Sequence, residues 1–260
     1  MAGRIRSLKD GQIAWIVFDH PERRNAISFD MWRQIPAVAK DLAADDDVRV
    51  VVIRGEGEHS FVAGADISEF SSHRTGTAVG DYDAASGRAF GALAKLGKPV
   101  IAQIHGSCIG GGMAVALTAD LRYAADDAVF AIPAARLGLG YHMAGMEALT
   151  SVVGFSAAKE IFFTARKFSA DEACDLGLVN RVLPAGELDA YVRETAERIA
   201  GNAPLTVKSV KRIVSELSKE PSARDVDAVD ASIRACFESE DYREGVQSFL
   251  EKRRPVFRGR

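Results

Sequence analysis

Short apolar runs recur along the chain and are separated by amphipathic segments. Residues 13–19 (IAWIVFD) and 48–55 (VRVVVIRG) are typical of strands, and the second is nearly all apolar, which predicts burial on both of its faces. Residues 98–106 (KPVIAQIHG) predict another buried strand. Between the first two strands, Ser28 is a suitable N-cap for an amphipathic helix that ends before the acidic turn at residues 45–47.

The pattern changes near residue 190. Up to that point, a predicted helix that ends near residue 118 is followed by short strands at 121–125 (LRYAA) and 128–132 (AVFAI), and such alternation favours an α/β fold. Beyond it, amphipathic helices follow one another without a further strand. We therefore predict an α/β core over residues 1–195 and a helical region over residues 196–260, which packs either on another subunit or on its own core.

Composition and charge exclude several classes of function. The net charge of −3 gives no reason to expect a nucleic acid or an anionic membrane as partner, and no apolar run is long enough to span a bilayer. The first residues enter strand-like alternation without a signal-peptide core. Cys108, Cys174 and Cys236 are widely spaced and the five histidines are scattered, so we expect no disulfide framework, no metal site and a cytoplasmic location.

A run of three glycines, Gly110 to Gly112, leads into an apolar segment in the stretch IHGSCIGGGMAVAL. The run matches neither a Walker loop nor a dinucleotide fingerprint. The helix that follows is apolar on almost every face, which predicts that it is buried. The amides at its start lack intrahelical acceptors and suit an anionic oxygen, whereas the alternative is close packing of glycine against a neighbouring strand.

Five segments taken together resemble the crotonase, or enoyl-CoA hydratase/isomerase, family. They occur in the family's order and span essentially the whole chain. They are HPERRNAIS (20–28), FVAGADISEF (61–70), KPVIAQIHGSCIGGG (98–112), FTARKFSADEACDLGLVNRVLP (163–184) and FLEKRRPVF (249–257).

The resemblance implies a crotonase-like superhelix of β-β-α units with C-terminal helices that build homotrimers, often paired into hexamers. It also implies an acyl-CoA thioester as substrate, so that coenzyme A arrives as part of the substrate and no separate cofactor is expected. By similarity, the backbone amides of Ala65 and Gly111 hold the thioester oxygen as it becomes an enolate. The resemblance further assigns coenzyme A contacts to Arg23, Arg24, Ala63, Asp66, Ile67 and Lys252.

Two positions depart from the family pattern. Hydratases of this family use two glutamates to add water, and this chain has alanine at both matching positions, Ala114 and Ala134. A methyl group neither gives nor takes a proton, whereas a positioned acid or base contributes about 10²–10⁴ in rate. The ordinary hydration mechanism therefore cannot use these two residues.

Other side chains are candidates for the missing proton transfer. The segment LGLGYHMAGMEAL (137–149) carries Tyr141, His142 and Glu147, of which histidine is the commonest general base, although Glu147 equally suits the first turn of the next helix. A second group consists of Asp66, Glu69 and His73. His105 lies in a buried stretch and is expected to be a core histidine with its hydrogen bonds satisfied.

Three hypotheses for function follow. The leading one is an acyl-CoA enzyme whose chemistry passes through a thioester enolate, with a non-standard group for proton transfer; isomerisation, hydrolysis, decarboxylation and carbon–carbon cleavage stay open beside hydration. The second is a non-catalytic acyl-CoA binding or carrier protein, suggested by Ala114 and Ala134. A scaffold is the third, but an inert scaffold has little need of the glycine run.

Overall fold

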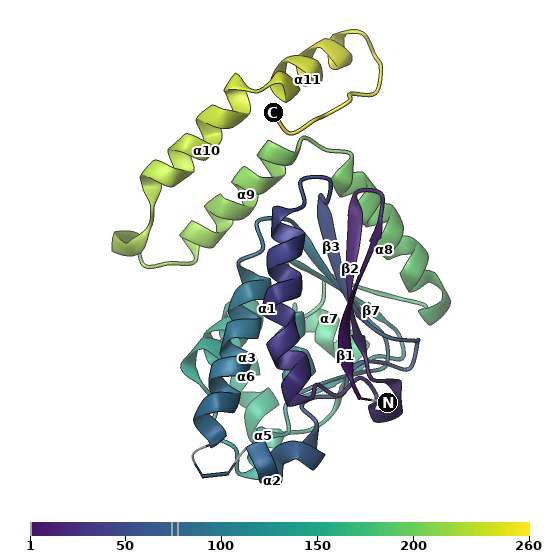
Figure 1. Ribbon diagram of the computed structural model, residues 1–260, viewed down its shortest axis with the longest axis vertical. Helices are drawn as coiled ribbons and strands as arrows, with labels where there is room; N and C mark the ends of the chain where they lie inside the picture. Colours follow the sequence, from purple (N-terminus) through teal and green to yellow (C-terminus); the bar gives the residue numbers. More distant parts are fainter. Residues whose placement is uncertain (1, 74, 77) are drawn as a thin grey trace.

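The computed structural model describes residues 2–73, 75–76 and 78–260 and has two sheets in this part of the chain. The larger sheet has the order β1-β2-β3-β5-β7-β10 (Figure 1). Its strands are β1 Arg4–Asp10, β2 Ile13–Asp19, β3 Val50–Gly55, β5 Val100–Ile104, β7 Leu121–Ala125 and β10 Arg181–Leu183. The smaller sheet has the order β4-β6-β8-β9, with β4 Ser60–Val62, β6 Ser107–Ile109, β8 Val129–Ala131 and β9 Phe168–Ser169.

A repeating β-β-α unit relates the two sheets. In the pairs β3–β4, β5–β6 and β7–β8, the first strand lies in the larger sheet and the second lies in the smaller sheet, and helices follow each pair. The first strands pair in parallel with one another, and so do the second strands. This arrangement confirms the predicted α/β fold of β-β-α units, and it brings the ends of successive second strands side by side.

Helices cover both faces of the larger sheet. The helices and 3₁₀ turns are η1 Pro21–Arg23, α1 Phe29–Ala44, η2 Ile67–Glu69, α2 Phe70–His73, α3 Ala78–Ala94, α4 Gly111–Ala116, α5 Ala134–Leu137, α6 Met143–Thr164, α7 Ala170–Asp175, α8 Ala185–Ala200, α9 Pro204–Leu217, η3 Pro221–Ala223, α10 Val226–Glu238 and α11 Glu240–Leu250. As predicted, Ser28 caps α1, and its Oγ accepts the N–H of Met31 at 3.3 Å. The main apolar core includes buried residues of α1, α3 and α4, and a second core joins α8 to the sheet.

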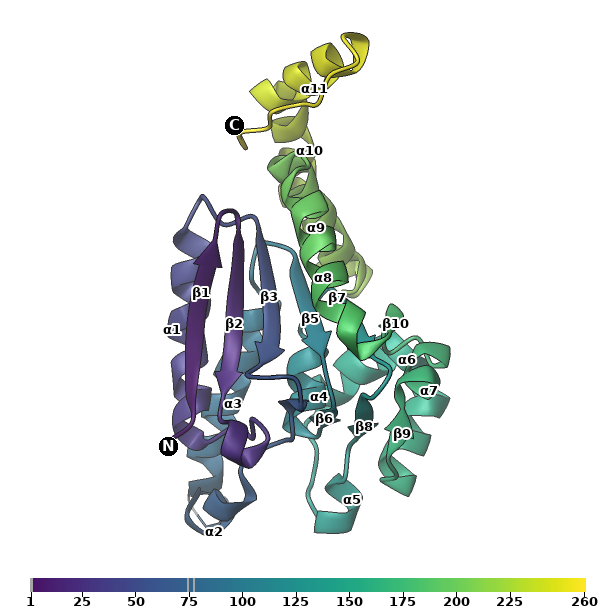
Figure 2. The ribbon, with the colours of Figure 1, turned by 90° about the vertical axis from the view of Figure 1, so that its right-hand side faces the viewer.

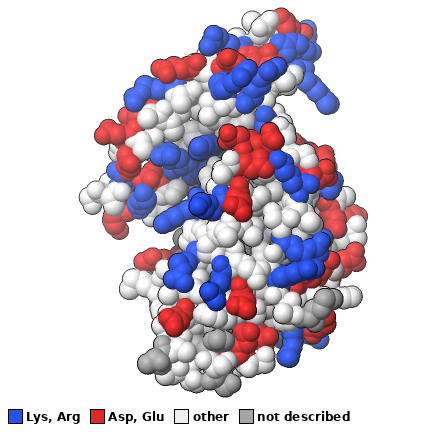
Figure 3. All heavy atoms as spheres, in the orientation of Figure 1, with Lys and Arg blue, Asp and Glu red and all other residues white. Residues whose placement is uncertain are grey.

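The C-terminal helices extend away from the sheets. Helices α9, α10 and α11 lie beyond one end of the larger sheet (Figures 1 and 2). The predicted boundary after residue 195 lies within α8, where Val192 and Ala196 both pack on the sheet. In the described residues, no helix is long and apolar enough to cross a membrane. Acidic and basic side chains are interspersed over the face shown in Figure 3.

Candidate active site

The glycine run forms the junction between β6 and α4. Gly110 has φ 51° and ψ −107°, a conformation that disfavours side chains, and its N–H donates to the carbonyl of Ala131 at 2.8 Å. The first bond of α4 runs from the Ala114 N–H to the Gly110 carbonyl, at 3.1 Å. The amide of Gly111 therefore precedes the hydrogen-bonded part of the helix.

The segment before η2 presents a second amide. Ile27 forms a parallel bridge with Ala65, donating to the Gly64 carbonyl at 2.8 Å and accepting from the Asp66 N–H at 2.9 Å. In a parallel bridge of this kind, the N–H of the central residue points away from the partner strand. The Ala65 amide is thus left available on the side opposite Ile27.

The backbone of Gly111 lies next to the Ala65 amide. A Cβ atom built on Gly111 would lie 3.4 Å from the Ala65 nitrogen and 3.6 Å from the Gly64 carbonyl carbon. In the described part of the chain, neither N–H has a hydrogen-bond acceptor. By contrast, a Cβ on Gly112 would lie 2.2 Å from the Val62 carbonyl oxygen. Gly112 therefore confirms the close-packing interpretation of the glycine run, whereas the binding of an anionic oxygen at Gly111 stays a prediction.

An aromatic pair lies behind Gly111. Trp32 Cζ2 lies 3.4 Å from the position of a Gly111 Cβ, and its indole N–H donates to the Tyr82 hydroxyl at 2.8 Å. Both side chains are buried, and Phe29 stacks on the Tyr82 ring. We did not predict this pair from the sequence, because single aromatic residues in helices most often belong to the core.

The residues that the resemblance assigns to coenzyme A contacts lie in two separate parts of the structure. The Ala63 N–H donates to the carbonyl of Arg24 at 3.1 Å, which joins the exposed turn of Arg23 and Arg24 to the segment that carries Ala65. Ile67 is 62% exposed at the start of η2. Lys252 instead follows α11, at the opposite end of the molecule from α2 (Figure 1). Within a single chain, Lys252 therefore lies away from the other residues that are predicted to contact coenzyme A.

Asp66 is charged and ordered at this site. Partial burial opposes its ionisation, but hydrogen bonds from Ser68 and the charges of Arg23 and His20 outweigh that effect and hold the pKa of Asp66 below its ordinary value. The Ser68 N–H and Oγ donate to Asp66 Oδ1 at 3.0 and 2.7 Å. Its carboxylate therefore caps η2.

The two alanines line the same region. Ala114 is half-buried on α4, and Ala134 is 6% exposed at the start of α5. A Cβ on Gly110 would lie 3.9 Å from Pro133 Cδ, so that the residue before Ala134 borders the glycine run. The methyl groups leave no acid or base at either position.

The three candidates of residues 137–149, which run from the end of α5 into α6, have different surroundings. Tyr141 packs edge-on against Phe162, with 4.7 Å between the ring centroids. His142 precedes α6, and its Nε2 lies 3.0 Å from the carboxylate Oδ2 of Asp83 on α3. Glu147 is exposed and is the fifth residue of α6, so the alternative role in the first helical turn is wrong.

The remaining candidates have structural contacts. Glu69 accepts the N–H of Phe29 at 2.7 Å, where it satisfies the start of α1. The side chain of His73 lies outside the described residues. His105 is 5% exposed and its Nε2 lies 3.0 Å from Asp189 Oδ1, which confirms its burial, but its buried Nδ1 lacks a partner, so the expectation of a fully satisfied ring is wrong. Among the described residues, no group of three or more His, Cys, Asp or Glu side chains is placed to hold a metal ion.

Curated relatives match nearly the whole chain. A short-chain-enoyl-CoA hydratase of Clostridium acetobutylicum is 35% identical over 258 residues, with 95% of this chain and 94% of the relative covered. A peroxisomal Delta(3,5)-Delta(2,4)-dienoyl-CoA isomerase of Arabidopsis thaliana is 34% identical, with 97% of this chain and 95% of the relative covered.

Solved structures and a family model agree with these relatives. An enoyl-CoA hydratase/isomerase family protein of Hyphomonas neptunium superimposes with a TM-score of 0.93 and 37% identity, with 98% of each chain covered. An enoyl-CoA hydratase/carnithine racemase of Magnetospirillum magneticum gives a TM-score of 0.92 at 33% identity, over 98% of this chain and 96% of that one. The enoyl-CoA hydratase/isomerase family model matches residues 9–260. This chain therefore belongs to the enoyl-CoA hydratase/isomerase family, as the sequence motifs predicted.

Proposed function

We propose that the protein is an enzyme that binds an acyl-CoA thioester and stabilises its enolate with the amides of Ala65 and Gly111. The observation that carries this proposal is the placement of two unpaired N–H donors next to each other, with the nitrogen of one 3.4 Å from the Cβ position of the other. Such donors act on the charge that develops on oxygen, and loss of one typically costs about 10²–10³ in rate.

The proposed reaction places negative charge on the thioester oxygen, and the site must stabilise that charge. Removal of a proton from the carbon next to a thioester carbonyl leaves an enolate, whose oxygen gains negative charge. Amides fixed in the backbone bind that oxygen without reorganising, so they favour the enolate over the neutral thioester. Arg23, Arg24, Ala63, Asp66 and Ile67, near Ala65, are proposed to contact coenzyme A, which enters and leaves as part of the substrate.

Hydration of a simple enoyl thioester is expected to be slow. Ala114 and Ala134 supply no acid or base, and each such group is worth about 10²–10⁴ in rate. We expect the loss of crotonyl-CoA absorbance to proceed at least about 10²-fold more slowly than with a relative that carries both glutamates. A rate equal to that of such a relative would contradict the role given to the two alanines.

Calorimetric titration with acetyl-, butyryl- and hexanoyl-CoA separates the proposed enzyme from other classes of protein. Heat of binding is expected for at least one thioester. Binding without catalysed exchange of the α-hydrogen for solvent deuterium would favour the non-catalytic carrier. The absence of binding for the whole panel would contradict both the enzyme and the carrier.

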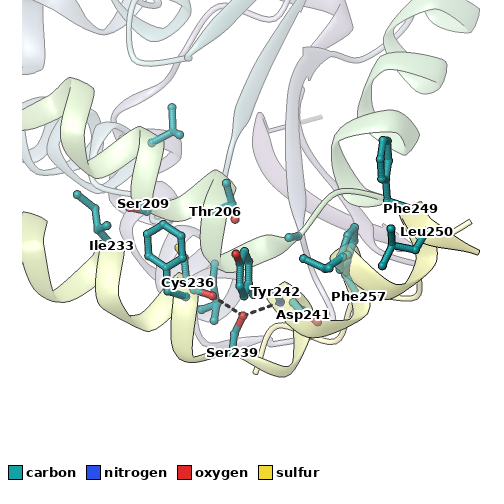
Figure 4. A pocket seen from close by; sticks show the side chains of 16 residues that line it. Thr206, Ser209, Ile233, Cys236, Ser239, Asp241, Tyr242, Phe249, Leu250 and Phe257 are labelled. Atoms are coloured by element: carbon teal, nitrogen blue, oxygen red, sulfur yellow. Dashed lines mark hydrogen bonds between the residues drawn. The ribbon is translucent and has the colours of Figure 1, made fainter.

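The C-terminal helices are proposed to form the interface of a homotrimer. A groove of about 670 Å³ lies among α9, α10 and α11, and apolar side chains such as Ile233, Tyr242 and Phe257 line it (Figure 4). Phe249 and Leu250, at the end of α11, are 83% and 75% exposed. An apolar surface of this kind is a typical protein interface, and a second copy of the chain is the occupant that the family implies.

A charged residue introduced on this surface tests whether the surface forms the interface of an oligomer. We expect Phe249→Glu to convert the oligomer into monomers in analytical ultracentrifugation, because a carboxylate would have to lose its water in an apolar interface. Lys40→Glu is a suitable control, since it reverses a charge on the exposed face of α1, outside the C-terminal helices. A monomeric wild-type protein, or an unchanged mass for Phe249→Glu, would contradict the proposed interface.

A further inference from the structure

A histidine–aspartate pair joins the start of α6 to α3, a helix that also contacts α4 after the glycine run. His142 Nε2 lies 3.0 Å from Asp83 Oδ2. His142 immediately precedes α6, whereas Asp83 belongs to α3, so the two residues are 59 positions apart. The Asp83 side chain is only 30% exposed, and a partly buried carboxylate is a better fixed partner than one on the open surface.

The pair fixes which imidazole nitrogen can accept a proton. An ionised carboxylate only accepts hydrogen bonds, so the neutral ring must carry its hydrogen on Nε2. The other nitrogen, Nδ1, is then the basic one. In the described residues, no group donates to Nδ1 of His142. This is the arrangement of an oriented general base, in which a carboxylate sets the tautomer and the free nitrogen faces its reactant.

Two lines of contact connect this pair to the amide of Gly111. On the Asp83 side, the adjacent residue Tyr82 accepts the Trp32 indole N–H at 2.8 Å, and the Trp32 ring lies 3.4 Å from the Cβ position of Gly111. Helix α3 also contacts α4, which begins at Gly111. Asp83 therefore follows directly along α3 the residue whose hydroxyl accepts the Trp32 indole N–H, and Trp32 lies next to Gly111.

The segment that carries His142 also connects to the glycine run, through residues that precede His142 in the chain. The Leu139 N–H donates to the Ala134 carbonyl at 3.1 Å, which holds the start of this segment against a position where the family has a glutamate. Pro133, in turn, lies 3.9 Å from the Cβ position of Gly110. The segment that carries His142 is thus anchored beside the glycine run.

The other ionisable candidates are less suited to move a proton. Glu69 is bonded to the Phe29 N–H, and the carboxylate of Asp66 caps η2 with its pKa held below the ordinary value. Glu147 is exposed on α6, and in the described residues its side chain has no partner that would orient it. His105 also pairs with an aspartate, Asp189, but it is buried in the core at 5% exposure, whereas the His142 side chain is 77% exposed and open to a substrate.

We propose that His142 is the group that removes and returns the proton at the substrate α-carbon, and that Asp83 is its positioning residue. This inference rests on the proposed enolate chemistry. Nδ1 forms a bond to the α-hydrogen, the electrons of the broken C–H bond pass into the enolate, and its oxygen takes the charge beside Ala65 and Gly111. The imidazolium formed is stabilised by Asp83. Return of the proton from Nδ1 to carbon restores the neutral ring.

Exchange of the α-hydrogen of butyryl-CoA and hexanoyl-CoA for solvent deuterium, followed by mass spectrometry, measures this step whatever the final reaction is. We expect His142→Ala to lower the exchange rate by at least about 10²-fold with little change in calorimetric affinity. Added imidazole should restore part of the rate, because the His142 side chain is 77% exposed and the vacated space is open to solvent. Rescue of this kind reports proton transfer, which a merely structural role would not give.

Asp83 is tested through its dependence on His142. Asp83→Asn is expected to lower exchange by at least about 10-fold, because the carboxylate that sets the His142 tautomer is lost, and Asp83→Glu to recover much of the loss. In the His142→Ala protein, the change at Asp83 should have no further effect on exchange. Equal losses in both backgrounds would show that Asp83 acts on stability and not through His142.

The outcomes separate this inference from the proposed function. If wild-type exchange depends on Gly111 but not on His142, the histidine role is wrong and the enolate chemistry stands. If neither thioester exchanges with the wild-type protein, the proposed function fails, and this inference fails with it.

Discussion

Gly111→Pro is expected to abolish nearly all catalysed exchange of the α-hydrogen while the protein stays folded. Proline removes the N–H that we assign to the enolate oxygen, and the first position of a helix is where a proline ring is best tolerated. The expected loss is about 10²–10³-fold in rate, the usual effect of removing one oxyanion donor. Deuterium incorporation into butyryl-CoA gives the rate, and circular dichroism checks the fold.

Gly111→Ala is the matched control for this change. It adds a Cβ at the same place, 3.4 Å from both the Ala65 nitrogen and Trp32 Cζ2, but it keeps the N–H. The rate difference between the alanine and proline variants therefore reports the loss of the N–H together with the ring carbon that replaces its hydrogen, and not the added Cβ. Equal exchange rates for the two variants would show that the Gly111 amide does not stabilise the enolate.

The next glycine is expected to control stability. A Cβ on Gly112 would lie 2.2 Å from the Val62 carbonyl oxygen and 2.9 Å from the Val62 Cβ. Because the first of these contacts is with backbone, β4 or α4 must move to relieve it. We expect Gly112→Ala to lower the free energy of unfolding by about 1–3 kcal/mol, the usual cost of overpacking, as measured by urea denaturation.

Gly140 offers a control for the stability effect. No atom lies within 4 Å of a Cβ built at Gly140, so Gly140→Ala is expected to change the free energy of unfolding by less than about 0.5 kcal/mol. A Gly112→Ala protein as stable as the Gly140→Ala protein would mean that β4 and α4 adjust freely. The position of Gly111 would then not depend on close packing between β4 and α4.

Much of the fold was predictable because buried strands and helices have regular apolar patterns in the sequence. The apolar run ending at Gly55 forms β3, and the segment that begins after Ser28 forms α1 over the residues expected. The helical character beyond residue 190 was predicted correctly, since α9, α10 and α11 each follow a regular apolar spacing. Helix α4 is shorter than expected and ends at Ala116, because hydrophobicity alone does not fix where a buried helix stops.

The site was only partly predictable. Motifs indicated Ala65 and Gly111, and the backbone of Gly111 lies next to the Ala65 nitrogen, while their role as donors to an enolate stays a prediction. The partner of His142 could not be inferred, because Asp83 lies 59 residues away on a helix that also carries Asp81. A pairing of that kind depends on how α3 packs beside the start of α6, which no local spacing records. The same holds for Lys252, whose distance from the site is set by the direction of the C-terminal helices.

The proposed oxygen-binding amides belong to two successive turns of the coil of β-β-α units, one after β4 and the other after β6. A thioester oxygen held by both would act as a cross-link between neighbouring turns. Sliding of one turn against the next would separate the donors without unfolding either strand. The same contact, between the thioester oxygen and the two amides, would therefore both bind the substrate and hold the two turns of the coil in register.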